Sequence, residues 1–178
     1  MRSFALSVWA VLWVLTPVCS GRLTTTEKRI QDARMLARSA IIRIQQLNGR
    51  FRPSPNIEIS GLNLIPAPLR DSAQENLGTV HGALSCFIES LSALQISNTG
   101  QIQADLKNLK VLVRSLATSH NCLASKCGTS RQLKNFLRRN SAFVLTIKHI
   151  VLDRLQNYLS RLLWVLDNPL SCMGPPLI

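Results

Sequence analysis

The 178-residue sequence has few acidic residues and lacks the motifs that most often mark an active site. Its 9 Asp and Glu are dispersed, so no pair of carboxylates is placed for acid–base catalysis. It has no glycine-rich phosphate loop, His-Glu-x-x-His, Cys-x-x-Cys or Gly-x-Ser-x-Gly motif. His120, Cys122 and Cys127 lie close together, but a fourth zinc ligand is missing. We therefore expect no enzymatic activity, no metal and no other cofactor.

The sequence also lacks the pattern of a nucleic-acid-binding protein, although its 21 Lys and Arg give a formal net charge of +12. The basic residues are scattered, and no basic stripe carries interleaved aromatic side chains. The charge predicts a solvated basic surface, and a weak association with heparan sulfate is the further interaction that it suggests. No Asn-x-Ser/Thr motif is present, so N-glycosylation is not expected.

Residues 1–20 have the pattern of a secretory signal peptide. A positive charge at Arg2 precedes an apolar run, and small residues follow that run. The run is shorter than the roughly 20 residues that a membrane-spanning helix requires. Cleavage after Ser20 or Gly21 would leave residues 21–178 or 22–178 as a single domain, which contains no second apolar run long enough to span a membrane. We therefore expect a secreted, extracellular protein that does not insert into a membrane.

Four segments have strong helical periodicity, and no segment alternates apolar and polar residues as a strand does. The predicted helices span residues 26–47, 71–94, 101–119 and 141–167. Each carries apolar residues every three or four positions, which is typical of a helix that packs one face into a core. Gly78 and Gly82 each lower helix stability by roughly 1 kcal/mol, so the second helix depends most on tertiary packing.

The lengths of the links between these helices predict how the helices are arranged. The first and third links, residues 48–70 and 120–140, are long, whereas the second, residues 95–100, is short. A helix of about 22 residues is roughly 33 Å long, so a link of about 20 residues can return along it and leave the next helix parallel. A short link forces its two helices to be antiparallel neighbours. A long link, a short link and a long link, in that order, therefore predict an all-α, up-up-down-down four-helix bundle.

Secretion makes the cysteines candidates for disulfide bonds. Cys19 is lost with the signal peptide, and Cys86, Cys122, Cys127 and Cys172 remain. Four cysteines allow three complete pairings, and their spacing alone does not choose among them.

Three stretches of the sequence resemble the leptin family. They are Ile59–Pro66, Gln101–Ala117 followed by Cys122, and Leu155–Asp167 followed by Cys172. The first is similar to the family's Gly-Leu-Asp-Phe-Ile-Pro segment, with Asn63 in place of Asp and Leu64 in place of Phe. The first helix matches more loosely, through Asp32, Arg38, Arg43 and Ile44. The resemblance covers nearly all of the expected mature chain except Ala124–Arg139.

The resemblance implies one disulfide bond, between Cys122 and Cys172, which would clamp the end of the last helix onto the bundle. Closing a loop of about 50 residues suggests a stabilisation of roughly 4 kcal/mol. The family pattern does not account for Cys86 and Cys127. Because Cys86 precedes Phe87 on an apolar stretch, it is a candidate for a buried thiol. Cys127 has three alternatives: a free thiol, a bond to Cys86, or a bond to a second chain.

The resemblance also implies two receptor-binding faces. The positions that match the first face, on the helices at 26–47 and 101–119, are Asp32, Arg38, Arg43, Gln101, Asn108 and Leu112. The positions that match the second face, in the first link and the last helix, are Leu62, Asn63, Leu64, Ile65 and Thr146. Val111 stands where the family has an acidic residue, and Ile147 where it has a hydroxyl. Packing onto the core is the alternative role for Leu64 and Ile65, and simple solvent exposure for the polar residues.

By this resemblance the protein is a leptin-like hormone that binds the ectodomain of a class I cytokine receptor, the leptin receptor. It would act as a monomer, start Janus-kinase signalling and serve energy balance and appetite. Its role would be geometric, because it holds two surfaces at a fixed angle. The alternatives are another long-chain helical cytokine, or a basic secreted defence protein that binds glycosaminoglycans or membranes. The last alternative predicts salt-dependent adsorption without a receptor.

Overall fold

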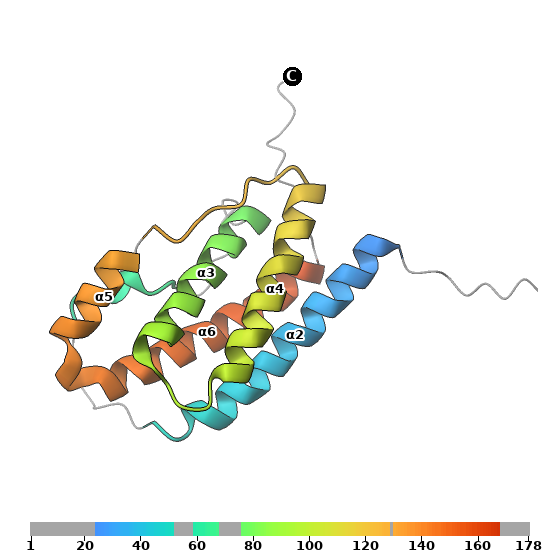
Figure 1. Cartoon of the computed structure of the whole chain (residues 1–178). Coiled ribbons are helices and arrows are strands. Elements are labelled where there is room, and N and C mark those ends of the chain that lie inside the picture. Colours follow the sequence, from blue (N-terminus) through green and yellow to red (C-terminus); the bar gives the residue numbers. More distant parts are fainter. Residues whose placement is uncertain (1–23, 52–58, 68–75, 129, 168–178) are drawn as a thin grey trace, which may run out of the picture.

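The computed structural model describes residues 24–51, 59–67, 76–128 and 130–167, and the secondary structure in these ranges is entirely helical (Figure 1). The α-helices are α2 (Thr25–Asn48), α3 (Leu77–Leu94), α4 (Gly100–Ser119), α5 (Ser130–Arg139) and α6 (Val144–Asp167), and the 3-10 helices are η1 (Leu62–Leu64) and η2 (Ser141–Phe143). The predicted all-α fold is thereby confirmed for the described residues. The predicted signal peptide, residues 1–20, and Cys172 lie outside them.

Helix α2 begins where Thr24 caps it. The Thr24 hydroxyl accepts a hydrogen bond from the Glu27 amide at 3.3 Å, and the Glu27 carboxylate accepts one from the Thr24 amide at 2.8 Å. This reciprocal pair satisfies amides that the start of a helix leaves without partners. The buried face of α2 carries the small residues Ala33, Ala37 and Ala40. Neighbouring helices can therefore approach its backbone closely.

The predicted start of the second helix, Asp71, lies outside the described residues, and helix α3 begins at Leu77. Asn76 is the reason, because its side-chain oxygen accepts hydrogen bonds from the amides of Gly78 at 2.9 Å and Thr79 at 3.1 Å. Asn is among the residues that most favour this capping position. By length and mean hydropathy, α3 alone among the described helices resembles a membrane span, but half of that window is buried inside the bundle.

Helices α4 and α6 complete the core with rows of aliphatic side chains. Leu106 and Leu109 of α4 and Leu155 of α6 have no exposed surface. Phe87 of α3 packs on Tyr158 of α6 with ring centroids 5.4 Å apart and the rings tilted, a favourable arrangement for an aromatic pair. The apolar stripes read from the sequence thus meet in one core.

The third predicted link, residues 120–140, contains helix α5, which the sequence analysis missed. Helix α5 has 10 residues and buries Leu133 and Phe136 against the bundle. So short a helix places too few apolar residues on one face for its periodicity to stand out. The next turn, predicted as the start of the last α-helix, is η2, so α6 begins at Val144 rather than at Ser141.

Contacts between the helices show the relative direction of neighbouring pairs. Near the start of α2, Arg34 binds Leu166 and Asp167 at the end of α6. Further along α2, Arg43 binds Asp105 in the first half of α4. Helix α2 is therefore antiparallel to both α4 and α6, as Figure 1 also shows. The up-up-down-down order of the whole bundle stays a prediction, which these pairwise directions support.

Candidate functional site

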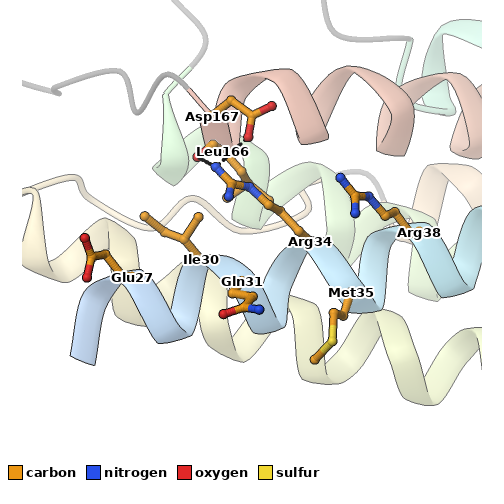
Figure 2. Close-up of a pocket in the computed structure, with 8 residues that line it drawn as sticks. All are labelled: Glu27, Ile30, Gln31, Arg34, Met35, Arg38, Leu166 and Asp167. Carbon is orange, nitrogen blue, oxygen red and sulfur yellow. Dashed lines mark hydrogen bonds and ion pairs between the residues drawn. The ribbon is translucent and has the colours of Figure 1, made fainter. Parts of the chain in front are cut away.

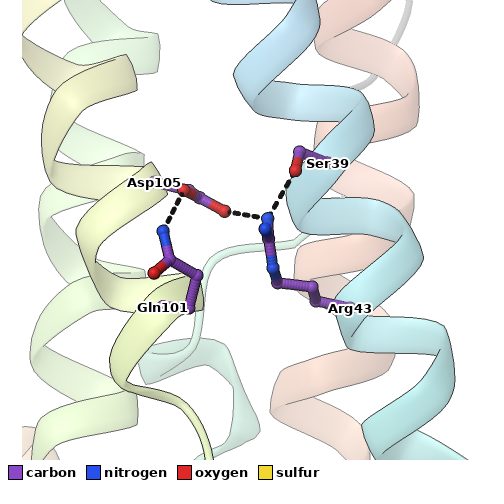
Figure 3. Close-up of polar contacts among 4 residues, drawn as sticks. All are labelled: Ser39, Arg43, Gln101 and Asp105. Atoms are coloured by element: carbon purple, nitrogen blue, oxygen red, sulfur yellow. Dashed lines mark hydrogen bonds and ion pairs between the residues drawn. The ribbon is translucent and has the colours of Figure 1, made fainter.

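A polar network joins α2 to α4 at the first predicted face (Figure 3). Arg43 Nη1 lies 2.5 Å from Asp105 Oδ2, and Gln101 Nε2 donates a hydrogen bond to Asp105 Oδ1 at 2.9 Å. Arg43 also donates to the hydroxyl of Ser39. Asp105 is buried, and a buried carboxylate destabilises a protein unless it is paired and hydrogen-bonded. Arg43, predicted as a receptor contact, therefore holds α2 and α4 together, and Gln101, also predicted as one, satisfies the second oxygen of Asp105 within α4.

Sequence analysis did not assign a role to Asp105, although a signal was present. Asp105 lies three residues after Ile102 and four before Leu109, so it falls on the apolar stripe of its helix. A carboxylate on a buried stripe requires a cation from a neighbouring helix. Arg43 of α2 meets that requirement.

Beside this network, α2 and α4 form an open hollow of about 540 Å³. It is lined by Asp32, Met35, Leu36, Ser39, Asn108, Val111 and Leu112. Asn108 is exposed, Asp32 is partly exposed, and Leu112 packs partly against the core. Met35 and Val111 are 57% and 65% exposed, which is high for apolar side chains. The structure thus brings three of the predicted residues together around an exposed apolar surface.

The predicted residue Arg38 lines a different hollow, of about 510 Å³, between α2 and the end of α6 (Figure 2). Arg34, in the same hollow, makes an ion pair with Asp167 at 2.5 Å and donates to the carbonyl oxygen of Leu166 at 3.2 Å. Arg34 therefore ties the end of α6 to α2, whereas the side chain of Arg38 is exposed. The predicted residues Asp32 and Arg38 of α2 therefore line two different hollows, and Met35 lines both.

At the second predicted face, Arg154 of α6 holds η1 on the bundle. Its Nη1 donates to the carbonyl oxygens of Leu62 at 2.6 Å and Ile65 at 2.9 Å. Ile65 is buried, and Leu62 and Leu64 are partly buried against the core. Asn63 is exposed. The packing role that the sequence left open for Leu64 and Ile65 is therefore observed.

Helix α5 covers the other side of η1. Gly61 has a positive φ of 94°, and a Cβ atom there would stand 2.9 Å from the Phe136 ring, so only glycine fits without strain. A hollow of about 580 Å³ lies between the two segments and is lined by Ser60, Gly61, Asn63, Leu64, Gln132, Asn135, Phe136, Arg139 and Asn140. The predicted residue Thr146 is buried. Of this face's predicted residues, Asn63 and Leu64 line the hollow, together with side chains of α5 that the sequence analysis missed.

The segment Cys122–Gly128, called the strap below, crosses directly over the start of α3. A Cβ atom on Gly78 would lie 2.0 Å from the carbonyl oxygen of Leu123, and one on Gly82 would lie 2.1 Å from Ser125 Oγ. The Ser125 amide donates to the Gly78 carbonyl oxygen at 3.1 Å, and the Ser125 hydroxyl donates to it at 2.9 Å. The two glycines that weaken α3 as a helix are therefore the positions where the strap contacts its backbone.

Disulfide bonds secure both ends of the strap. Cys127 is bonded to Cys86 of α3, with Cα atoms 5.1 Å apart. Of the alternatives for these two cysteines, the bond between them is correct, and a buried thiol, a free thiol and a bond to a second chain are wrong. Cys122 is also disulfide-bonded. Because Cys172 lies outside the described residues, its pairing with Cys122 stays a prediction.

Comparisons with known proteins agree with this architecture. The family model for leptin matches residues 26–172. The chain is 28% identical to leptin of Macaca mulatta over 171 residues, covering 93% of this chain and 98% of that protein. It is 27% identical to leptin of Felis catus over 164 residues and 26% identical to leptin of Homo sapiens over 166 residues, each covering 90% of this chain and 95% of the relative. The chain therefore belongs to the leptin family, whose members are hormones and not enzymes.

Proposed function

We propose that the chain is a secreted, monomeric hormone that binds and activates a class I cytokine receptor of the leptin type, signalling in energy balance and appetite. The proposal also includes cleavage of residues 1–20 as a signal peptide. The observation that carries it is the exposed apolar surface around the α2–α4 hollow, where Met35 and Val111 lie beside Asn108. Exposed apolar surface rimmed by polar groups is typical of a protein-binding site.

The first receptor contact is proposed for the α2–α4 hollow. Burial of Met35, Val111 and Leu112 by a partner would remove apolar surface from water, and Asp32 and Asn108 would supply polar contacts at the rim. Arg43 acts indirectly, because its side chain binds Asp105 and so holds α2 at a fixed spacing from α4, and Gln101 supports Asp105 within α4. Val111 replaces the acidic residue of the family, so this contact depends more on apolar burial here.

The second contact is proposed for the hollow between η1 and α5, with Asn63 and Leu64 at its edge. Arg154 fixes η1 to α6, and Phe136 of α5 packs against Gly61. A second contact on the same rigid bundle would let one ligand bring two receptor chains together. Ile65 and Thr146 are buried, so their proposed contribution is to support the backbone of this face.

The test uses the refolded mature chain on cells with and without a leptin-type receptor, and its ectodomain in solution. The variant Asn108→Lys/Val111→Lys changes two exposed residues of the first face. We expect binding to weaken by about a hundredfold, because central interface residues each contribute about 1–2 kcal/mol or more. The control Leu123→Lys/Asn157→Lys adds the same charge at two exposed residues that line neither hollow, and it should bind normally.

The second face is tested with Asn63→Lys, which changes an exposed residue of η1. We expect this variant to bind the ectodomain but to signal poorly, because one of its two contacts is disrupted. Equal, salt-sensitive adsorption of all variants to both cell types, without receptor-dependent signalling, would contradict the hormone proposal and favour the basic binding protein.

A further inference from the structure

Helix α5 lies in the stretch, Ala124–Arg139, that departs from the leptin family pattern. Its sequence, Ser-Arg-Gln-Leu-Lys-Asn-Phe-Leu-Arg-Arg, contains four basic residues and no acidic one. The sequence analysis treated the basic residues of the chain as scattered. Because this stretch folds into a helix, its basic side chains lie close together. The expectation of basic residues scattered over a solvated surface therefore does not hold here.

The basic and apolar residues of α5 occupy opposite faces. Arg131, Arg138 and Arg139 are exposed, whereas Leu133 and Phe136 are buried against the bundle. Residues seven positions apart return to nearly the same side of a helix, so Arg131 and Arg138 lie in one row about 10 Å long. The bundle therefore presents a short line of guanidinium groups to solvent.

No carboxylate neutralises this line within the described part of the chain. Residues 106–152 contain nine Lys and Arg and no Asp or Glu. Among the described residues, Arg131, Arg138 and Arg139 make no ion pair. Glu89 of α3 and Lys134 line one hollow, so a carboxylate lies near that lysine, and Lys134 is left out of the set. The three arginines are available for an external anion.

The surroundings of the arginines favour a sulfated polysaccharide over a membrane. The apolar face of α5 is already buried, so the helix has no apolar face with which to enter a bilayer. Arg139 lies at the hollow between η1 and α5, which also presents the amides of Asn63, Gln132 and Asn135. Amides can donate and accept hydrogen bonds with sugar hydroxyls, and guanidinium groups bind oxyanions in a bidentate manner.

We propose that the exposed face of α5, with Arg131, Arg138 and Arg139, binds a sulfated glycosaminoglycan of the heparan sulfate class. The three guanidinium groups contact sulfates along one short segment of the polysaccharide, and the amides of the adjacent hollow contact its hydroxyls. The adjacent hollow is also the proposed second receptor contact, so the polysaccharide and the receptor would compete for it. Binding to the polysaccharide would retain the secreted chain on cell surfaces and matrix.

The experiment measures binding of the mature chain to immobilised heparin over a range of salt concentrations. The test variant is Arg131→Gln/Arg138→Gln/Arg139→Gln, and the control is Lys28→Gln/Lys107→Gln/Arg114→Gln, which removes the same charge at exposed positions on α2 and α4. Each lost sulfate contact should reduce the slope of log affinity against log salt by about one, by analogy with phosphate contacts. We expect about a tenfold or larger loss for the test variant and a much smaller loss for the control.

Circular dichroism and the melting temperature show that both variants are folded before binding is compared. Equal losses in the two variants would mean that heparin senses only the total charge, and the proposal would be wrong. Two further probes are desulfated heparin and phosphatidylserine vesicles. Binding to desulfated heparin as tight as to heparin, or α5-dependent binding to vesicles that exceeds binding to heparin, would also overturn it.

Discussion

Gly78→Ala tests whether the strap is held against α3 as the structure indicates. Two physical effects of this substitution have opposite signs. Alanine in place of glycine in a helix stabilises it by about 1 kcal/mol, so helix propensity alone predicts a more stable protein. The added Cβ, however, would stand 2.0 Å from the carbonyl oxygen of Leu123, a backbone atom that cannot rotate away. The strap must therefore move.

The cost of that movement can be worked from the contacts of Ser125. Its amide and hydroxyl donate to the Gly78 carbonyl oxygen at 3.1 and 2.9 Å, and its own carbonyl oxygen lies 2.8 Å from Nδ1 of His81. Each of these hydrogen bonds contributes about 1 kcal/mol. Their loss outweighs the gain in propensity, so we expect Gly78→Ala to lower the free energy of unfolding by about 1–2 kcal/mol.

The assay is equilibrium unfolding in urea, followed by far-UV circular dichroism with the disulfide bonds intact. Gly100→Ala is the matched control, because Gly100 is in the first turn of α4 and its added Cβ would meet nothing within 4 Å. We expect the control to be neutral or slightly more stable. If Gly78→Ala is as stable as Gly100→Ala, then the strap does not constrain α3, and the reasoning is refuted.

Two further predictions concern the bundle. Arg43→Gln leaves the buried Asp105 without its cation and should destabilise the protein by about 2–3 kcal/mol, whereas Arg43→Gln/Asp105→Asn should recover part of that loss. A double-mutant cycle measured by urea unfolding checks this prediction. Additive effects of the two substitutions would contradict the pairing. Cys86→Ser/Cys127→Ser opens a loop between residues 41 positions apart, and chain entropy predicts a loss of up to about 4 kcal/mol. A melting temperature unchanged from that of the parent would contradict a stabilising role for this bond.

The long helices could be predicted from the sequence because a buried stripe is a local property of the chain. The predicted bounds of the first helix, 26–47, differ from those of α2, Thr25–Asn48, by one residue at each end. Helix α5 could not be predicted in the same way, because burial of Leu133 and Phe136 depends on the bundle and on Gly61 of a distant segment. The start of α3 at Leu77 depends on capping by Asn76, a preference that the prediction did not consider.

The candidate site was predicted less completely than the fold. Resemblance named Arg43, Gln101, Ile65 and Thr146 as receptor positions, but it cannot distinguish a side chain that contacts a partner from one that supports the fold. Arg43 and Gln101 bind Asp105, and the other two are buried. Those distinctions depend on which atoms the folded chain places around each side chain.

The sequence by itself determined that the chain is helical, that it resembles the leptin family and that its cysteines are candidates for disulfide bonds. Only the tertiary structure decided that Cys86 bonds to Cys127, that Gly78 contacts the strap and that three arginines lie exposed on α5. Periodicity and motifs are properties of neighbouring residues and can be read along the chain. Pairings between distant residues depend on how the helices pack, and packing exists only once the whole chain has folded.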